Sequence, residues 1–115
     1  YKYLRKSPFH DQVKVHFGDA LEILDQLSGP FDLVFIDAGK EHYLEYYERV
    51  IHKVRKGGII LVDNVLWSGK VYSDPQDDTA RIIHKFNRFV RQDNRVEIVI
   101  LPIRDGLSLI RKTTD

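Results

Sequence analysis

Two short stretches place oxygen ligands and a lysine at the ends of apolar runs. The segment "FIDAGKEHY" carries Asp37 at the tip of one run and Lys40 three residues later, and "ILVDN" ends in Asp63 and Asn64. If the two runs are neighbouring parallel strands, their carboxyl ends lie about 5 Å apart. Two carboxylates at that separation repel unless a cation or a proton holds them together. Oxygen ligands without histidine or cysteine favour Mg²⁺, Mn²⁺ or Ca²⁺, so the pattern predicts a divalent cation site.

Two side chains near this predicted site have types that suit chemistry. Lys40 is a candidate proton acceptor, because the positive charge of a nearby ion lowers the pKa of an ammonium group. Trp67 is a candidate platform for a flat substrate. Each residue also has a structural interpretation: Asp37 as a helix cap, Asp63 and Asn64 as a turn, Lys40 as a solvated loop residue and Trp67 as a surface anchor. Their meeting on adjacent strand tips favours the chemical interpretation.

The elements that position these residues follow from the hydropathy pattern. Strands alternate with helices in the order β-α-β-α-β-α-β-β, which predicts an α/β fold with a mostly parallel sheet and a C-terminal antiparallel hairpin. The strands that carry Asp37 and Asp63 are nearly continuous apolar runs, which predicts cover on both faces. The predicted elements are a strand over 13–17, a helix over 20–27, a strand over 31–37, a helix over 42–54 ended by Lys56, Gly57 and Gly58, a strand over 59–63, a helix capped by Asp77 or Asp78 with an apolar stripe of Ile82, Ile83, Phe86, Phe89 and Val90, and a hairpin of 96–103 and 107–112.

The composition is that of one folded globular domain. The 115 residues are 43% hydrophobic and 30% charged, with a net charge of +1 that gives no sign of a nucleic-acid or membrane partner. No apolar stretch approaches the about 18 residues that span a bilayer. The absence of cysteine excludes disulfides and thiolate metal sites and fits a cytoplasmic location. Because there is no methionine, even at position 1, we expect the chain to be part of a longer protein.

Three segments together resemble a known enzyme family. "FDLVFIDAGKEHYLEYYE", "RKGGIILVDNVLWSGKV" and "ILPIRDGLSLIRK" are similar to cation-dependent O-methyltransferases of the caffeoyl-CoA and catechol type, from about Val13 to the C-terminus. The resemblance implies a Rossmann-like class I methyltransferase sheet that lacks its first strands, in a single partial domain over 1–115. It implies S-adenosylmethionine as methyl donor, and a divalent cation, Mg²⁺ before Mn²⁺ or Ca²⁺, held by Asp37, Asp63 and Asn64.

The resemblance also assigns roles by position. The acceptor is a small molecule with a metal-chelated hydroxyl of catechol-like or caffeoyl type, and Lys40 takes the proton of that hydroxyl. Catechols, caffeoyl esters, flavonoids and bacterial polyphenols remain equally possible acceptors. The implied cofactor contacts are Asp19, Ala20, Asp37 and Gly39, and the implied substrate contacts are Trp67 and Lys40.

The sequence departs from the family pattern in two places. Many relatives carry an aspartate at the position of Gly39, where it touches the cofactor. The glycine-rich turn after the first family strand, and the acidic residue that ends the second, are not in this sequence. In the family sheet the strands that carry them lie between 13–17 and 31–37. We therefore expect the isolated chain to bind S-adenosylmethionine poorly, to be inactive alone, and to self-associate, as a homodimer or otherwise, through exposed apolar edges.

Two other functions stay open at this stage. A truncated or degenerate methyltransferase fold could serve as a non-catalytic interaction module, which the glycine at position 39 favours and the intact Asp37, Lys40, Asp63 and Asn64 oppose. A phospho-acceptor signalling domain would use Asp37 as the acceptor. That fold needs an acidic pair after its first strand, and this chain has none.

Overall fold

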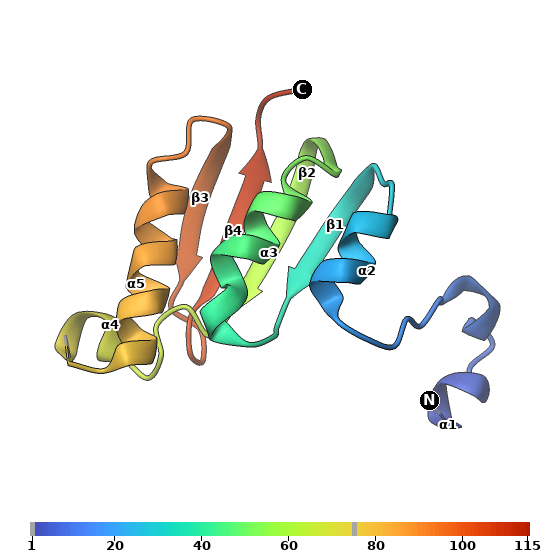
Figure 1. The fold of residues 1–115 in the computed structure, drawn as a ribbon, viewed down its shortest axis with the longest axis horizontal. Coiled ribbons are helices and arrows are strands. Elements are labelled where there is room, and N and C mark those ends of the chain that lie inside the picture. Colours follow the sequence, from blue (N-terminus) through green and yellow to red (C-terminus); the bar gives the residue numbers. More distant parts are fainter. Residues whose placement is uncertain (1, 75) are drawn as a thin grey trace.

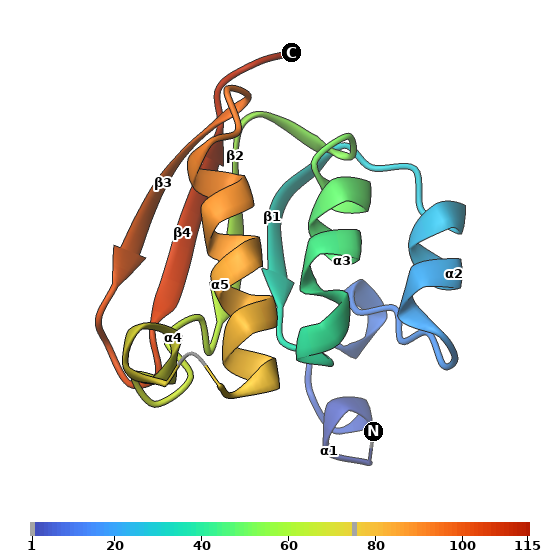
Figure 2. The ribbon, with the colours of Figure 1, turned by 60° about the vertical axis from the view of Figure 1, so that its left-hand side comes forward.

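The computed structural model describes residues 2–74 and 76–115, which form one sheet with its main helices on one side (Figures 1 and 2). None of the helices described is long and apolar enough to cross a membrane. The elements are α1 (Lys2–Arg5), the 3₁₀ helix η1 (His10–Gln12), α2 (Ala20–Gln26), β1 (Phe31–Ile36), the 3₁₀ helix η2 (Lys40–His42), α3 (Tyr43–Val50), β2 (Val54–Asp63), α4 (Lys70–Ser73), α5 (Asp78–Arg91), β3 (Val96–Leu101) and β4 (Leu107–Lys112).

The strand order is β1-β2-β4-β3, which corrects the prediction of a mostly parallel sheet. Only β1 and β2 pair in parallel; β4 lies antiparallel to both β2 and β3. The hairpin between β3 and β4 confirms the prediction for the C-terminal strands, but β4 inserts between β2 and β3. Strands β1, β2 and β3 therefore point the same way, although two of the three described pairings are antiparallel (Figure 1).

Residues 13–17 do not form the predicted strand. Val13, Val15 and Phe17 are exposed, and the segment belongs to no sheet. A strand needs a neighbour to pair its backbone groups. The neighbours that the family resemblance gives this segment are absent from the sequence, so alternation of apolar residues alone does not make a strand here.

The helix predicted over 42–54 is shorter than expected, and a strand begins sooner. Helix α3 ends at Val50, and β2 starts at Val54, so the two glycines lie inside a strand rather than at a helix end. Between Phe31 and Leu33 the register shifts, because β2 carries extra residues there. Gly57 has φ +82°, a conformation that suits glycine, so the pair marks a bulge in β2.

Helices α3 and α5 form the core against one face of the sheet. Phe86 on α5 packs edge-on against Tyr43 and Tyr47 of α3, with ring centroids 5.6 and 6.0 Å apart. Asp77 caps α5 through the backbone N–H of Ala80, as predicted. Within the predicted α5 stripe the structure buries Ile83, Phe86 and Val90, whereas Ile82 and Phe89 are partly exposed.

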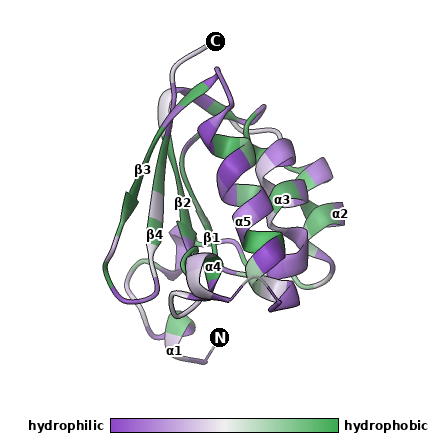
Figure 3. Cartoon of the chain, turned by 90° about the vertical axis from the view of Figure 1, so that its left-hand side faces the viewer, coloured by the Kyte–Doolittle hydropathy of each residue, from purple (hydrophilic) through white to green (hydrophobic). Residues whose placement is uncertain are grey.

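The other face of the sheet carries exposed apolar side chains, and we call it the open face. Leu33, Phe35 and Val99 are each more than half exposed. The prediction that β1 is covered on both faces is therefore wrong. By register, Phe35 lies beside Leu61, Leu61 beside Leu109, and Leu109 beside Val99. An apolar row thus crosses all four strands, whereas α2, α3 and α5 lie on the opposite side (Figure 3).

A hydrogen-bonded carboxylate ties α3 to the turn before β3. Tyr47 donates its hydroxyl to Asp93 Oδ2 at 2.7 Å, and Arg95 contacts both carboxylate oxygens through Nε and Nη2 at 2.9 and 2.8 Å. The Asp93 side chain is only 6% exposed. The hydrogen bond from Arg95 holds the pKa of Asp93 at about 2, below its ordinary value of 3.8.

The pH dependence of stability should reveal this carboxylate. Because the pKa of Asp93 is lower in the folded state, its contribution is present above about pH 4 and is lost as the pH falls through about 2. We expect Asp93→Asn to lower the urea midpoint at pH 7 and to flatten its fall between pH 4 and 2. Circular dichroism of urea unfolding measures both, with the exposed Asp25→Asn as the matched control. Parallel pH curves for Asp93→Asn and the unmodified chain would contradict this account.

Candidate functional site

The two strand tips that the sequence singled out lie side by side. Strand β1 pairs in parallel with β2, and Ile36 is in register with Val62. Asp37 directly follows β1, and Asp63 is the last residue of β2, so both lie at the carboxyl edge of the sheet (Figure 1). Asp37 is more than half exposed, so this edge is open to solvent.

Lys40 joins two of the three predicted ion ligands. Its ammonium nitrogen lies 3.6 Å from Asp37 Oδ1 and donates to Asn64 Oδ1 at 3.2 Å. It also donates to the carbonyl oxygen of Ala38 at 3.3 Å. The Lys40 side chain is 15% exposed. Oxygens from the ends of both strands therefore converge on a single cationic atom.

Asp63 is held by two contacts. Its Oδ1 accepts the backbone N–H of Asn64 at 2.8 Å, and its carbonyl oxygen accepts the hydroxyl of the buried Tyr43 at 2.9 Å. The tyrosine therefore fixes the backbone at the end of β2 against α3. One Asp63 oxygen carries no hydrogen bond to a described residue.

The protein groups around Lys40 favour its charged form. Burial lowers the pKa of Lys40, but the hydroxyl of Tyr43 and the carboxylate of Asp37 raise it more, so the pKa lies above its ordinary value. For Tyr43, burial raises the pKa, so its hydroxyl is neutral at pH 7. The lower lysine pKa expected from the sequence would have to come from the positive charge of an ion.

Asp105 also belongs to this site, and the sequence analysis missed it. Its Oδ2 accepts from Asn64 Nδ2 at 3.1 Å, and its Oδ1 accepts the backbone N–H of Ser68. In the sequence, Asp105 stands between Arg104 and Gly106, a pattern typical of a hairpin turn. The sequence predicts this turn between the two hairpin strands, but its closeness to Asn64 follows only from the pairing of β4 with β2.

Trp67 lies three residues after Asn64, in a loop with unusual backbone angles. Asn64, Trp67 and Ser68 have φ of +59°, +49° and +53°, a region that residues other than glycine seldom occupy. The indole is partly buried and packs against the hydrophobic core. Its predicted role as a substrate platform stays a prediction.

The predicted cofactor residues lie in two places. Asp19 caps α2 by accepting the N–H of Leu21 at 2.8 Å, and Ala20 is the exposed first residue of that helix. Gly39 immediately precedes η2 and stands two residues after Asp37 in the sequence. The start of α2 and the end of β1 lie at the same edge of the sheet (Figure 1). A side chain at position 39 would first meet the flexible end of Glu41, 3.0 Å from an added Cβ.

The predicted ion site is not a cluster of three acidic or histidine ligands. Among the described residues, no group of three or more His, Cys, Asp or Glu side chains is placed to hold a metal. The predicted set consists of two carboxylates and one amide, so only two of its members are acidic. The assignment of Asp37, Asp63 and Asn64 to an ion therefore stays a prediction.

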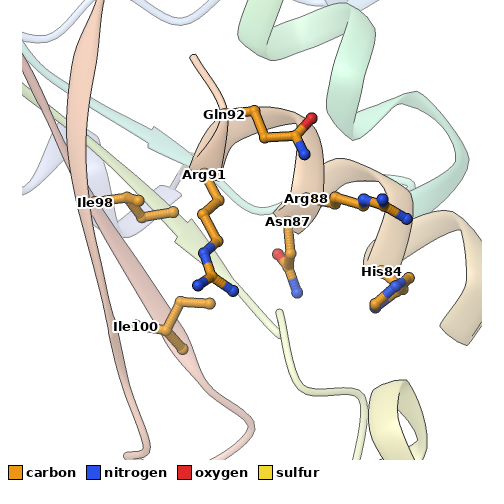
Figure 4. A pocket seen from close by; sticks show the side chains of 7 residues that line it. All are labelled: His84, Asn87, Arg88, Arg91, Gln92, Ile98 and Ile100. Atoms are coloured by element: carbon orange, nitrogen blue, oxygen red, sulfur yellow. The ribbon is translucent and has the colours of Figure 1, made fainter. Parts of the chain in front are cut away.

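A groove of about 790 Å³ lies away from these residues, between α5 and β3 (Figure 4). It is formed by polar and basic side chains of the helix and by two isoleucines of the strand, and it contains none of the predicted site residues. Its lining residues are His84, Asn87, Arg88, Arg91, Gln92, Ile98 and Ile100.

Comparison with known proteins points to one family. Residues 1–113 match the family model described as O-methyltransferase. Caffeoyl-CoA O-methyltransferase 1 of Eucalyptus globulus is 37% identical over 121 residues, which cover 95% of this chain and 49% of that protein. The SAH-bound methyltransferase PaMTH1 of Podospora anserina is 31% identical, with a TM-score of 0.87, over 97% of this chain and 54% of that one. TomG of Streptomyces achromogenes, solved in complex with SAM, is 28% identical, with a TM-score of 0.87, over 97% and 55%.

The chain spans about half the length of the curated relatives it matches. With TM-scores of 0.87, the α/β fold of the chain agrees with that of these methyltransferases over the matched half.

Proposed function

Because the chain belongs to the O-methyltransferase family, we propose that it takes part in methyl transfer from S-adenosylmethionine to a metal-chelated hydroxyl of a catechol-like or caffeoyl-type acceptor. The observation that carries this proposal is the convergence of Asp37 and Asn64 on the Lys40 ammonium, at the paired ends of β1 and β2. Asp63, next to Asn64, adds a second carboxylate with an oxygen that has no described partner.

These residues fit a hard divalent ion, Mg²⁺ first and Mn²⁺ or Ca²⁺ as alternatives. The donor set consists of oxygens, and two of its three members already contact one positive group. When bound there, such an ion lowers the pKa of a catechol hydroxyl and so supplies a better nucleophile at neutral pH. Asp37, Asp63 and Asn64 would hold the ion.

Lys40, in the neutral form that the positive charge of a bound ion would favour, is the group we propose to take the acceptor's proton. The neighbouring Tyr43 is a poor alternative base, because its hydroxyl proton is already donated to the carbonyl oxygen of Asp63. The Lys40 nitrogen lies 4.9 Å from the centre of the Tyr43 ring, and it contacts Asp37 and Asn64 at the strand tips. Trp67 would provide an apolar surface for the acceptor ring.

For the methyl donor, we propose contacts with Asp19, Ala20, Asp37 and Gly39. All four belong to the edge of the sheet where the α2 helix starts and β1 ends (Figure 1). S-adenosylmethionine carries the methyl group on a positively charged sulfur, which the acidic side chains at this edge would attract. Its remaining contacts would come from outside these 115 residues, because the glycine-rich turn is not among them.

The open face supports self-association, and we propose a homodimer or a related assembly in the cytoplasm. The same face favours a second candidate function, a non-catalytic interaction module, because Leu33, Phe35 and Val99 offer apolar surface.

Methyl transfer to a catechol separates these two functions. We expect the complete gene product to transfer methyl groups with Mg²⁺, to stop when EDTA is added, and to recover when Mg²⁺ is restored. Lys40→Met should slow transfer by about 10²–10⁴-fold, whereas Lys56→Met, on the β2 bulge, should leave the rate unchanged. Transfer that is insensitive to EDTA would contradict the proposed ion, and no transfer with Mg²⁺ would favour the interaction module.

A further inference from the structure

We propose that Asp105 is a positioning residue for the ion site: it orients the side-chain amide of Asn64 so that Oδ1, and not Nδ2, faces Lys40. The inference rests on the proposed function, since orientation matters most where an amide oxygen serves as a ligand. An ion binds the oxygen of an asparagine amide, never its NH₂ group.

The contacts on the two ends of the amide define its orientation. Asp105 Oδ2 accepts from Asn64 Nδ2 at 3.1 Å, and Lys40 Nζ donates to Asn64 Oδ1 at 3.2 Å. A carboxylate can only accept and an ammonium can only donate. Turning the amide over would put oxygen against oxygen at Asp105 and NH₂ against NH₃⁺ at Lys40. Both ends therefore select the same orientation.

Sheet topology brings Asp105 to this position. Strand β4 pairs with β2, and Asp63 is in register with Leu107, so the turn before β4 lies beside the end of β2. The backbone N–H of Leu66 donates to the carbonyl oxygen of Asp105 at 2.9 Å. Gly106 has φ +87°, and an added Cβ would lie 2.5 Å from Leu66 Cγ, so the turn fits closely against the loop that follows Asn64.

The same carboxylate also holds that loop, which gives it a structural role to be separated from the positioning role. Asp105 Oδ1 accepts the N–H of Ser68, within a loop where Asn64 and Ser68 have positive φ. Backbone conformations of this kind are strained and persist only where their surroundings impose them. A variant that keeps the loop but changes the amide contact is therefore required.

Asp105→Asn meets that requirement. Asparagine has the size of aspartate but only one accepting end. If its oxygen keeps the Ser68 contact, its NH₂ group faces Asn64 and favours the reversed amide. We expect this variant to bind Mn²⁺ about 10–100-fold more weakly than the unmodified chain. Its thermal unfolding midpoint should stay close to that of the unmodified chain, which a loss of the loop would not allow.

Mn²⁺ titration, followed by electron paramagnetic resonance of the free ion, tests the coupling. Asn64→Ala should weaken binding, and adding Asp105→Asn to it should weaken binding no further, because the carboxylate acts through the amide. Asp32→Asn, which removes a carboxylate at the other end of β1, is the matched control and should have no effect. Unchanged affinity in Asp105→Asn, or a full second loss in the double variant, would overturn the inference.

A second readout works without an ion. In ¹⁵N spectra, with Asn64→Ala used for assignment, the Asn64 NH₂ protons should exchange with water more slowly in the unmodified chain than in Asp105→Asn. Equal exchange would overturn the positioning role. Failure of the unmodified chain to bind Mn²⁺, with this difference in exchange intact, would count against the proposed function and leave the positioning role supported.

Discussion

Asp63→Asn is expected to weaken Mn²⁺ binding by about 100-fold or more. Loss of a residue that only hydrogen-bonds to a metal ligand already costs about 10–100-fold in affinity. The substitution removes one of the two charges that would face the ion. It keeps an oxygen for the N–H of Asn64 and leaves untouched the backbone carbonyl that binds Tyr43. The loss would therefore come from charge rather than from unfolding. Calorimetric titration of the 115-residue chain with Mn²⁺ measures it.

The control for this prediction is an exposed aspartate at the other end of β1. Asp32 lies near the start of β1 and forms an ion pair with Arg55, far along the strand from the site. Asp32→Asn makes the same change in net charge and should leave the affinity within about twofold of the unmodified chain. Equal affinities in Asp63→Asn and Asp32→Asn would remove Asp63 from the ion site.

Phe86→Ala is expected to lower the free energy of unfolding by about 3–5 kcal/mol. Its ring is 1% exposed and lies between α5 and the two tyrosines of α3. A small domain has about 5–15 kcal/mol in total, so the variant should lose a large share of its stability. Because Tyr43 also holds the backbone of Asp63, Mn²⁺ binding should weaken together with stability. Urea unfolding followed by circular dichroism gives the free energy.

Phe89→Ala on the same helix is the matched control. Phe89 is 38% exposed, and its ring centroid lies 6.2 Å from that of Tyr47. Removing it deletes the same atoms from a site that water already reaches, so we expect less than half of the loss in Phe86→Ala. Equal losses in the two variants would mean that Phe86 does not anchor the contact between α3 and α5.

Local patterns predicted the elements whose residues interact with near neighbours in the chain. Helix α2 begins after Asp19 as its capping side chain indicates, and α5 begins after Asp77. The hairpin of β3 and β4 follows from two apolar runs around a short turn. The adjacency of the tips of β1 and β2 follows from their connection through a helix.

Local sequence patterns do not predict features that depend on residues far apart in the chain. Residues 13–17 alternate like a strand but have no neighbour to pair with. Gly57 and Gly58 resemble a helix end, yet they form a bulge within a strand that packs beside β1. The contact between Asp105 and Asn64 joins residues 41 positions apart and exists only because β4 inserts between β2 and β3.

That insertion also constrains the order in which the molecule can form during synthesis. Strands β1 and β2 and helix α3 leave the ribosome first, and they can pair before the hairpin exists. The loop that carries Asn64, however, donates hydrogen bonds to residues 105 and 106, which emerge some forty positions later. The edge of the sheet that carries Asn64 is therefore among the last parts of the nascent chain to reach its native geometry.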